Sequence, residues 1–204
     1  MNLGRLSQVN ARVWLAPLVL ALVLVAFQAL GSPHWIALRY ERAAIMAGEA
    51  WRLASAHLIH VDRVHLAWNL AGLALVGWLF AREFSIPGWL VIMAASTIAI
   101  DLGFLLFEPQ LEWYVGFSGV LHGLMAAGLC AWLLRSRDSL TALVAGLFAL
   151  KLGWEHFAGA LPFTAATLTV PVIHAAHSYG AIGGAAAACW LLRRRRGSPA
   201  RPSL

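Results

Sequence analysis

Six long apolar stretches run along the chain, and they constrain its fold more than any other feature. They cover residues 13–30, 64–80, 86–107, 115–134, 140–157 and 171–192. A helix that crosses a bilayer needs about 20 mostly apolar residues, and each stretch approaches that length. Backbone groups in a bilayer must be hydrogen-bonded within the protein, and the ten-residue alternation of a membrane barrel does not occur. The pattern therefore predicts an all-α polytopic membrane protein, a bundle of six transmembrane helices.

The composition agrees with a chain that is solvated by lipid. Of the 204 residues, 61% are hydrophobic and 12% are charged, whereas about 25% of the residues in a soluble domain are charged. The six stretches leave no room for a separate soluble domain. We therefore expect a single membrane domain over residues 1–204, with a helical core at 13–192 and a disordered, basic cytoplasmic tail at 193–204.

Basic residues gather at one set of predicted helix ends, which orients the chain in the membrane. On the side of the two termini lie Arg5, Arg12, Arg82, Arg135, Arg137, the run Arg193 to Arg196, and Arg201. The opposite side has fewer arginines, and acidic residues dilute them. By the positive-inside rule, both termini are predicted to be cytoplasmic. The net charge of +6 comes from basic residues that are expected to bind anionic lipid headgroups. We therefore expect the bilayer as a partner, and no nucleic acid.

A serine between two glycines is the first candidate for chemistry. Ser118 follows Gly116-Phe117 and precedes Gly119 near the outer end of stretch 115–134, and His177 lies near the outer end of stretch 171–192. At the rise of an α-helix, these two residues lie roughly 5 Å and 9 Å along their helices, at similar depth. Serine becomes a good nucleophile when a nearby base removes its proton. The pair is therefore a candidate nucleophile and base.

Polar side chains of a third helix fall in the same layer. His65 and Asn69 lie four residues apart on one face of helix 64–80, close to its outer end. Polar side chains in a membrane interior are costly, and they usually line a cavity or bind a partner. We therefore expect three helices to converge on one polar pocket.

Pairs of glycines beside the serine and the histidine predict a close helix contact. Gly119 and Gly123 form a small-xxx-small ridge on one helix, and Gly180 and Gly184 form another. Such ridges let the backbones of membrane helices approach closely. The approach would bring Ser118 near His177.

Three motifs on these helices resemble those of the rhomboid family of intramembrane serine proteases. Residues 116–119 are similar to the family's G-x-S-G motif, His65-x-x-x-Asn69 to its H-x-x-x-N motif, and residues 177–184 to the motif of its sixth helix. The order and spacing of the motifs also agree. The resemblance begins at Trp51-Arg52, which is similar to a W-R pair in the family's first loop.

The resemblance implies a Ser-His dyad that needs no carboxylate, cofactor or metal ion. Ser118 would attack the scissile carbonyl, and His177 would take its proton and give it to the leaving amine. His65, Asn69 and the backbone N–H of Ser118 would form the oxyanion hole, with Gly116 beside it. The implied substrates are membrane-anchored proteins.

One departure from the family pattern indicates a subgroup. Many rhomboids have a tyrosine four residues after the nucleophile, which stacks on the catalytic histidine, but this chain has His122. Residues 116–123 resemble the rhombosortase subgroup, and residues 151–155 are similar to it as well. The resemblance implies cleavage of a C-terminal sorting segment made of a Gly-Gly motif, an apolar helix and a basic end. It also implies a bacterial inner-membrane location, with the active site open to the periplasm.

Several alternatives remain open at this point. His122 lies one turn from Ser118, so its spacing makes it a rival general base. A general rhomboid protease, which cleaves single-span membrane proteins, is a second interpretation of the same motifs. A catalytically inactive rhomboid-like protein is a third. The eight histidines also permit a metal or haem protein, although no carboxylate or cysteine completes a ligand set in the sequence.

Stretch 140–157 carries charged residues in its outer half. Lys151 and Glu155 are four residues apart and are expected to form an ion pair that faces the bundle. We expect the pair to shape a subsite for a small Gly-Gly segment or to stabilise the substrate entrance; a purely structural pair is the alternative. Asp101 lies apart from all these motifs in the sequence.

Overall fold

The computed structural model of the chain describes residues 12–136, 138–161 and 172–197. A long helix occupies each of the six apolar stretches. These helices are α1 (Arg12–Ala29), α5 (Arg63–Phe80), α6 (Ile86–Phe107), α7 (Ser118–Arg135), α8 (Ser139–Ala158) and α10 (His174–Gly197). The two strands in the described residues are two residues long, so the predicted all-α class is confirmed.

Three of these helices are long and apolar enough by themselves to cross a membrane. They are α5, α6 and α7. The apolar part of α1, Trp14–Ala29, is shorter than these. Lys151 and Glu155 interrupt α8, and α10 contains several glycines and histidines and has four arginines near its end. These three helices indicate a membrane protein, and the count of six spans stays a prediction.

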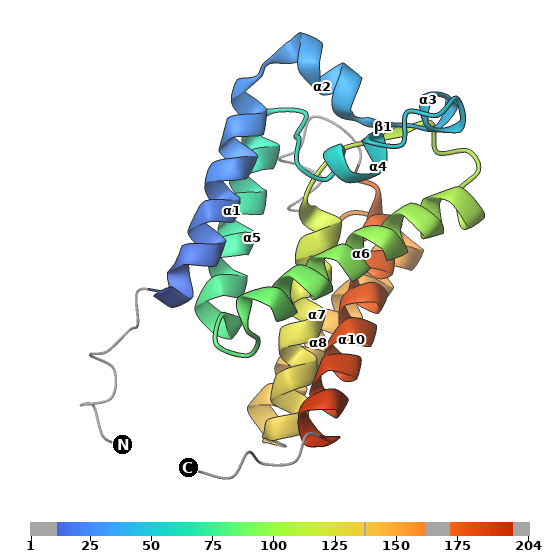
Figure 1. Cartoon of the computed structure of the whole chain (residues 1–204). Helices are drawn as coiled ribbons and strands as arrows, with labels where there is room; N and C mark the ends of the chain where they lie inside the picture. Colours follow the sequence, from blue (N-terminus) through green and yellow to red (C-terminus); the bar gives the residue numbers. More distant parts are fainter. Residues whose placement is uncertain (1–11, 137, 162–171, 198–204) are drawn as a thin grey trace.

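Short elements form a cap at one end of the bundle (Figure 1). They are α2 (Ser32–Leu38), β1 (Tyr40–Glu41), α3 (Arg42–Met46), α4 (Arg52–Ser55) and β2 (Trp113–Tyr114). Strands β1 and β2 pair antiparallel, with Tyr40 opposite Tyr114. The Arg42 side chain donates hydrogen bonds to the backbone carbonyls of Phe104 and Glu108, at 2.5 and 2.7 Å. The last carbonyls of a helix are the ones that need partners from outside it. Arg42 supplies such donors and so connects the cap to the end of α6.

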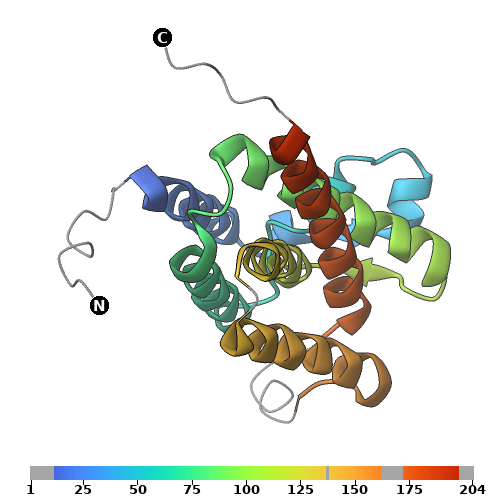
Figure 2. The same cartoon turned by 90° about the horizontal axis from the view of Figure 1, so that it is seen from below.

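Helix α7 lies at the centre of the bundle. Viewed along the helices, α5, α6, α8 and α10 surround it, and α1 packs against α5 on the outside (Figure 2). The inner face of α7 is buried over most of its length, including Gly119, Gly123 and Gly128. A central helix that packs against four others holds residues at its end in a well-defined position.

The predicted glycine contact between α7 and α10 is present. A Cβ atom on Gly180 would collide with the backbone carbonyl of Gly119, and one on Gly184 would collide with the backbone of Gly123. Only glycine permits this approach at these positions. The two ridges therefore join the helices that carry Ser118 and His177.

Helix α7 begins at Ser118, three residues later than the predicted boundary. The reason is Gly116, whose φ of +126° is incompatible with a right-handed helix. The N–H of Gly116 donates to the carbonyl of Ala56 at 2.9 Å, which attaches this turn to the cap. Ser118 consequently stands at the first position of α7.

The predicted tail needs a correction at its start. Helix α10 continues to Gly197, so residues 193–197 are helical and not disordered. Arginine is a good helix former, and its charge is favoured near a helix C-terminus. The guanidinium of Arg194 also lies over the ring of Trp190, 4.1 Å from its centre. Residues 198–204 and the predicted start of the last span at Pro171 lie outside the described residues.

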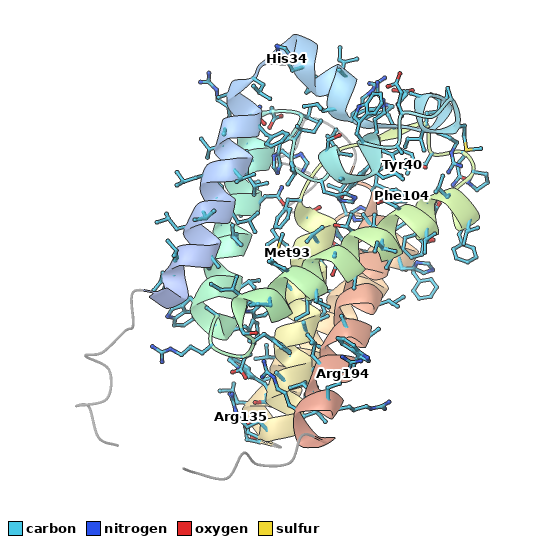
Figure 3. The ribbon with its side chains drawn as sticks, viewed as in Figure 1. His34, Tyr40, Met93, Phe104, Arg135 and Arg194 are labelled. Carbon is cyan, nitrogen blue, oxygen red and sulfur yellow. The ribbon has the colours of Figure 1, made fainter. Side chains whose placement is uncertain are left out.

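The start of α1 and the end of α10 lie at the same end of the bundle (Figure 1). Arg135 and Arg194 are at that end too, whereas His34, Tyr40 and Phe104 are at the opposite end, near the cap (Figure 3). This distribution of basic residues is the one from which the orientation was predicted. The orientation itself stays a prediction.

Candidate active site

Ser118 and His177 are in direct contact. The Ser118 Oγ atom lies 2.9 Å from Nε2 of His177, although 59 residues separate them in the chain. Ser118 is the first residue of α7, and His177 is in the first turn of α10. The glycine contact between the two helices brings these ends together. The predicted meeting of serine and histidine is therefore present in the structure.

The other ring nitrogen of His177 contacts a carboxylate. Nδ1 of His177 lies 2.9 Å from Oε2 of Glu155, which α8 contributes. Both side chains are buried, with 5% and 4% of their surface exposed, so water does not compete for this contact. The resemblance implies a dyad that requires no carboxylate, and the structure adds this contact to the dyad. The sequence could not reveal the contact, because Glu155 belongs to no motif of the dyad.

Lys151 links Glu155 to His122. Its ammonium donates to Oε2 of Glu155 at 2.6 Å, which confirms the predicted ion pair. The same ammonium lies 2.7 Å from Nε2 of His122, and Nδ1 of His122 lies 2.7 Å from the carbonyl oxygen of Ser118. Lysine only donates and a carbonyl only accepts. His122 must therefore be neutral, with its proton on Nδ1.

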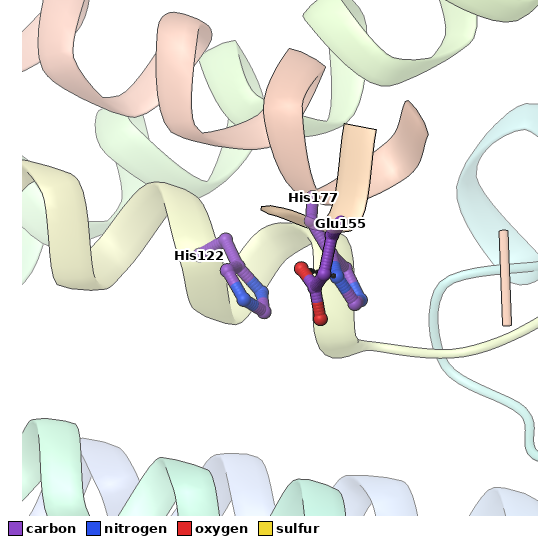
Figure 4. Close-up of side chains that lie close together, drawn as sticks. All are labelled: His122, Glu155 and His177. Carbon is purple, nitrogen blue, oxygen red and sulfur yellow. Dashed lines mark hydrogen bonds and ion pairs between the residues drawn. The ribbon is translucent and has the colours of Figure 1, made fainter. Parts of the chain in front are cut away.

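The rings of His122 and His177 are stacked (Figure 4). Their centres are 3.9 Å apart and their planes differ by 12°. His122 thus takes the place that the stacking tyrosine has in many rhomboids. Both of its nitrogens are engaged, with Lys151 and with the Ser118 carbonyl, so neither is available to the Ser118 hydroxyl. This geometry disfavours His122 as the base.

The residues predicted for the oxyanion hole lie beside the serine. The ring of His65 packs against Gly116, where an added Cβ would come within 2.7 Å of its Cε1 atom. Asn69 donates from Nδ2 to the carbonyl of His65 at 2.9 Å. Among the described residues, Oδ1 of Asn69 and Nδ1 of His65 have no hydrogen-bond partner. Oδ1 of Asn69 only accepts, so a hydrogen bond from Asn69 to an oxyanion must come from the second hydrogen of Nδ2.

A cavity of about 400 Å³ connects these groups. Helices α5, α7, α8 and α10 contribute to its wall. Its lining includes seven of the eight predicted site residues: His65, Asn69, Ser118, His122, Lys151, Glu155 and His177. The eighth, Gly116, is not part of the lining but packs against the ring of His65. The prediction of one polar pocket shared by several helices is confirmed, and α8 is an additional contributor.

The site also brings together a possible metal-ligand set, contrary to the expectation that no carboxylate would complete one. Ligand atoms of His122, Glu155 and His177 lie within 4.8 Å of one another. Each ring nitrogen of the two histidines is already hydrogen-bonded. The Lys151 ammonium, a cation, lies next to both His122 and Glu155. Because a second cation would be repelled there, the residues do not fit a metal ion.

Outside the cavity, a second polar cluster supports the loop before α5. His57 lies 3.3 Å from the Asp101 carboxylate, so Asp101 is not isolated in the fold as it is in the sequence.

His60 is fully buried, and neither of its ring nitrogens has a hydrogen-bond partner among the described residues. Burial lowers the pKa of His60 to about 3. Tyr114 donates to the Gly116 carbonyl at 2.7 Å and so supports the turn before Ser118.

The fold and the site together define the class of this protein. The family model of the rhomboid domain matches residues 47–194, which is most of the chain, and the chain belongs to the rhomboid family. The match begins close to the Trp51-Arg52 pair and ends within α10, the helix that carries His177. It therefore includes every residue of the cavity.

Two curated relatives come from Bacillus subtilis (strain 168). Rhomboid protease GluP is 31% identical over 87 residues, which is 43% of this chain and 17% of the relative. Putative rhomboid protease YdcA is 27% identical over 142 residues, which is 67% of this chain and 65% of the relative. The chain thus spans less than two thirds of the length of either relative.

Proposed function

We propose that the protein is an intramembrane serine endopeptidase with Ser118 as nucleophile and His177 as general base. The observation that carries the proposal is the 2.9 Å contact between Ser118 Oγ and His177 Nε2. That distance permits proton transfer without movement of either helix. The alternative of a catalytically inactive rhomboid-like protein does not explain why this pair is aligned.

The reaction follows from the two atoms in contact. As Ser118 Oγ bonds to the scissile carbonyl carbon, its proton moves to His177 Nε2. When the carbon–nitrogen bond breaks, His177 gives this proton to the leaving amine. A water molecule then attacks the acyl-enzyme by the same steps, which releases the new carboxyl end and restores Ser118.

Donors beside Ser118 are suited to the negative charge that develops on the carbonyl oxygen. The first N–H groups of a helix have no partner within it, and Ser118 is the first residue of α7. His65 and Asn69 line the same cavity. Preorganised donors of this kind each contribute about 3 kcal/mol to the stability of the transition state.

For the substrate, we propose the C-terminal sorting segment of surface or secreted proteins. The support is the similarity of residues 116–123 to rhombosortases, together with the stacked His122 that departs from the family's tyrosine. A chain with a Gly-Gly motif is narrow, and Ser118 and Lys151 line the same cavity of about 400 Å³. A general rhomboid specificity for single-span membrane proteins is the alternative.

We further propose a bacterial inner-membrane protein with six spans and cytoplasmic termini. In this orientation the end of the bundle with Arg135 and Arg194 faces the cytoplasm, and the end with His34 and Tyr40 faces the periplasm (Figure 3). The arginine-rich end then contacts anionic lipid headgroups.

Co-expression with a reporter tests the function. The reporter ends in a Gly-Gly motif, an apolar helix and basic residues, and a matched reporter keeps the helix but replaces both glycines by leucine. We expect wild type to release the first reporter from the membrane and Ser118→Ala to release neither. Release of both reporters to the same extent would favour the general rhomboid specificity.

A second experiment assigns the base. His177→Ala should abolish cleavage and labelling of Ser118 by a fluorophosphonate, whereas His122→Ala should only weaken them, because stacking support is lost. The reverse ranking would make His122 the base. A wild-type protein that neither cleaves nor reacts with the fluorophosphonate would refute the proposed function.

A further inference from the structure

We propose that Glu155 is a positioning residue that completes a Ser118–His177–Glu155 relay, with Lys151 as the counterion of the carboxylate. The inference rests on the proposed function and deepens it, because the motifs imply a dyad. It starts from the chain of contacts from Ser118 Oγ to His177 Nε2, and from His177 Nδ1 to Glu155 Oε2, each 2.9 Å long.

The carboxylate decides which nitrogen of His177 carries the proton. An ionised carboxylate only accepts, so the neutral ring must place its hydrogen on Nδ1. The lone pair is then on Nε2, the atom that faces the Ser118 hydroxyl. When His177 takes the serine proton, Glu155 faces the positive ring across a buried hydrogen bond, where an opposite charge is most effective.

A lone carboxylate at this depth would be costly, and Lys151 removes the cost. Glu155 is 4% exposed and lies among apolar helices, an environment in which an unpaired charge is strongly disfavoured. The Lys151 ammonium binds the same oxygen, Oε2, that accepts from His177. Its remaining contact with Nε2 of His122 holds the ammonium in place. His122 in turn binds the carbonyl of Ser118, so the network returns to the nucleophile.

The rival explanation is that Lys151 and Glu155 form an ion pair that only stabilises the fold. The two explanations differ on one variant, in which both charges are removed together. Lys151→Met with Glu155→Leu leaves no unpaired charge and keeps the apolar volume, so a structural pair is replaceable. The relay is not replaceable in this way, because His177 Nδ1 loses the carboxylate acceptor that Glu155 supplies.

A matched control is present at the other end of α7. Arg135 and Glu83 form an ion pair at 2.6 Å, and Arg135 is the last residue of the helix that Ser118 begins. The distance along α7 is about 26 Å. Arg135→Met with Glu83→Leu thus removes an ion pair of the same length that is more exposed and remote from the cavity.

The test measures kcat and KM on the Gly-Gly reporter, together with thermal unfolding in detergent. For Lys151→Met/Glu155→Leu we expect a folded protein with kcat reduced by about 10² to 10⁴ and KM within threefold of wild type, as when the carboxylate of a soluble triad is removed. The Arg135→Met/Glu83→Leu control should keep wild-type kcat. Wild-type kcat in both double variants would overturn the proposal.

Two single variants test the proposal independently, in case the double variant does not fold. Glu155→Gln keeps the shape but presents an amide that can donate to Nδ1 and favour the wrong tautomer, so kcat should fall by about 10² to 10⁴. Glu155→Asp keeps the charge and should recover at least tenfold relative to Glu155→Gln. Equal activity of Gln, Asp and wild type at position 155 would overturn the relay, while cleavage by wild type and its loss in Ser118→Ala would still support the protease.

Discussion

Replacing Gly184 by alanine should separate α7 from α10 and misalign Ser118 and His177 without touching either residue. A Cβ atom at Gly184 would lie 2.1 Å from the carbonyl oxygen of Gly123 and 2.5 Å from its Cα and C atoms, whereas real Cβ atoms essentially never approach another atom below 3.0 Å. The helices must therefore move apart by about 0.9 Å, since a packed backbone does not deform locally. Because helices are stiff, most of this shift reaches the site two turns away.

The size of the effect follows from the hydrogen bond in the site. The contact of 2.9 Å between Ser118 Oγ and His177 Nε2 would lengthen to about 3.8 Å, beyond the hydrogen-bond range. A misplacement of about 1 Å costs roughly 100-fold in rate. We expect kcat/KM on the reporter to fall about 100-fold, and the free energy of unfolding to fall by about 1–3 kcal/mol from overpacking.

The assay compares reporter cleavage and fluorophosphonate labelling of Gly184→Ala with those of Gly146→Ala. A Cβ at Gly146 meets nothing within 4 Å, so this control adds the same methyl group to a helix without a clash. It should keep wild-type activity and gain about 1 kcal/mol of stability. If Gly184→Ala also stays within twofold of wild type, the helix contact does not align the pair and the reasoning is refuted.

Three further predictions concern the surroundings of the site. Gly116→Ala should reduce cleavage at least tenfold and lower thermal stability, because φ is +126° and the Cβ would displace the His65 ring; wild-type cleavage would exclude a role for this turn. His60 is neutral when folded and binds a proton below about pH 6.5 when unfolded, so its contribution to stability falls by up to about 1.4 kcal/mol per unit from pH 6.5 towards pH 3. His60→Phe should flatten that profile in denaturant titrations, and an unchanged slope would contradict the assignment. Asp138 caps α8, and hydrogen bonds from the Thr141 N–H and nearby hydroxyls lower its pKa to about 2, so Asp138→Ala should speed hydrogen exchange at the Thr141 amide. In wild type the Thr141 amide should be fully protected from hydrogen exchange above pH 3.8, and this protection should be lost as the pH falls through 2. Equal exchange rates at Thr141 in wild type and Asp138→Ala would show that the cap is not formed.

The helices and the Ser118–His177 pair were predictable from the sequence, but the exact ends of the helices were not. Apolar length and glycine spacing are local properties of the chain, so they can be recognised without knowledge of the fold. The start of α7 at Ser118 depends on the φ of Gly116, which the contact with Ala56 in the cap stabilises. The helical continuation to Gly197 is accompanied by contacts of Arg194 with the ring of Trp190 and of Arg195 with the carbonyl of Glu83.

The sequence by itself determined the all-α membrane class, because that class follows from composition and apolar length, and it contained the family motifs, whose resemblance nominated the candidate site residues. Only the tertiary structure decided how those residues are used. It placed Glu155 on His177, gave Lys151 both Glu155 and His122 as partners, and turned His122 from a rival base into a stacked neighbour. The physical reason is that these contacts join α7, α8 and α10, and the rotation of one helix relative to another is set by packing rather than by residue spacing.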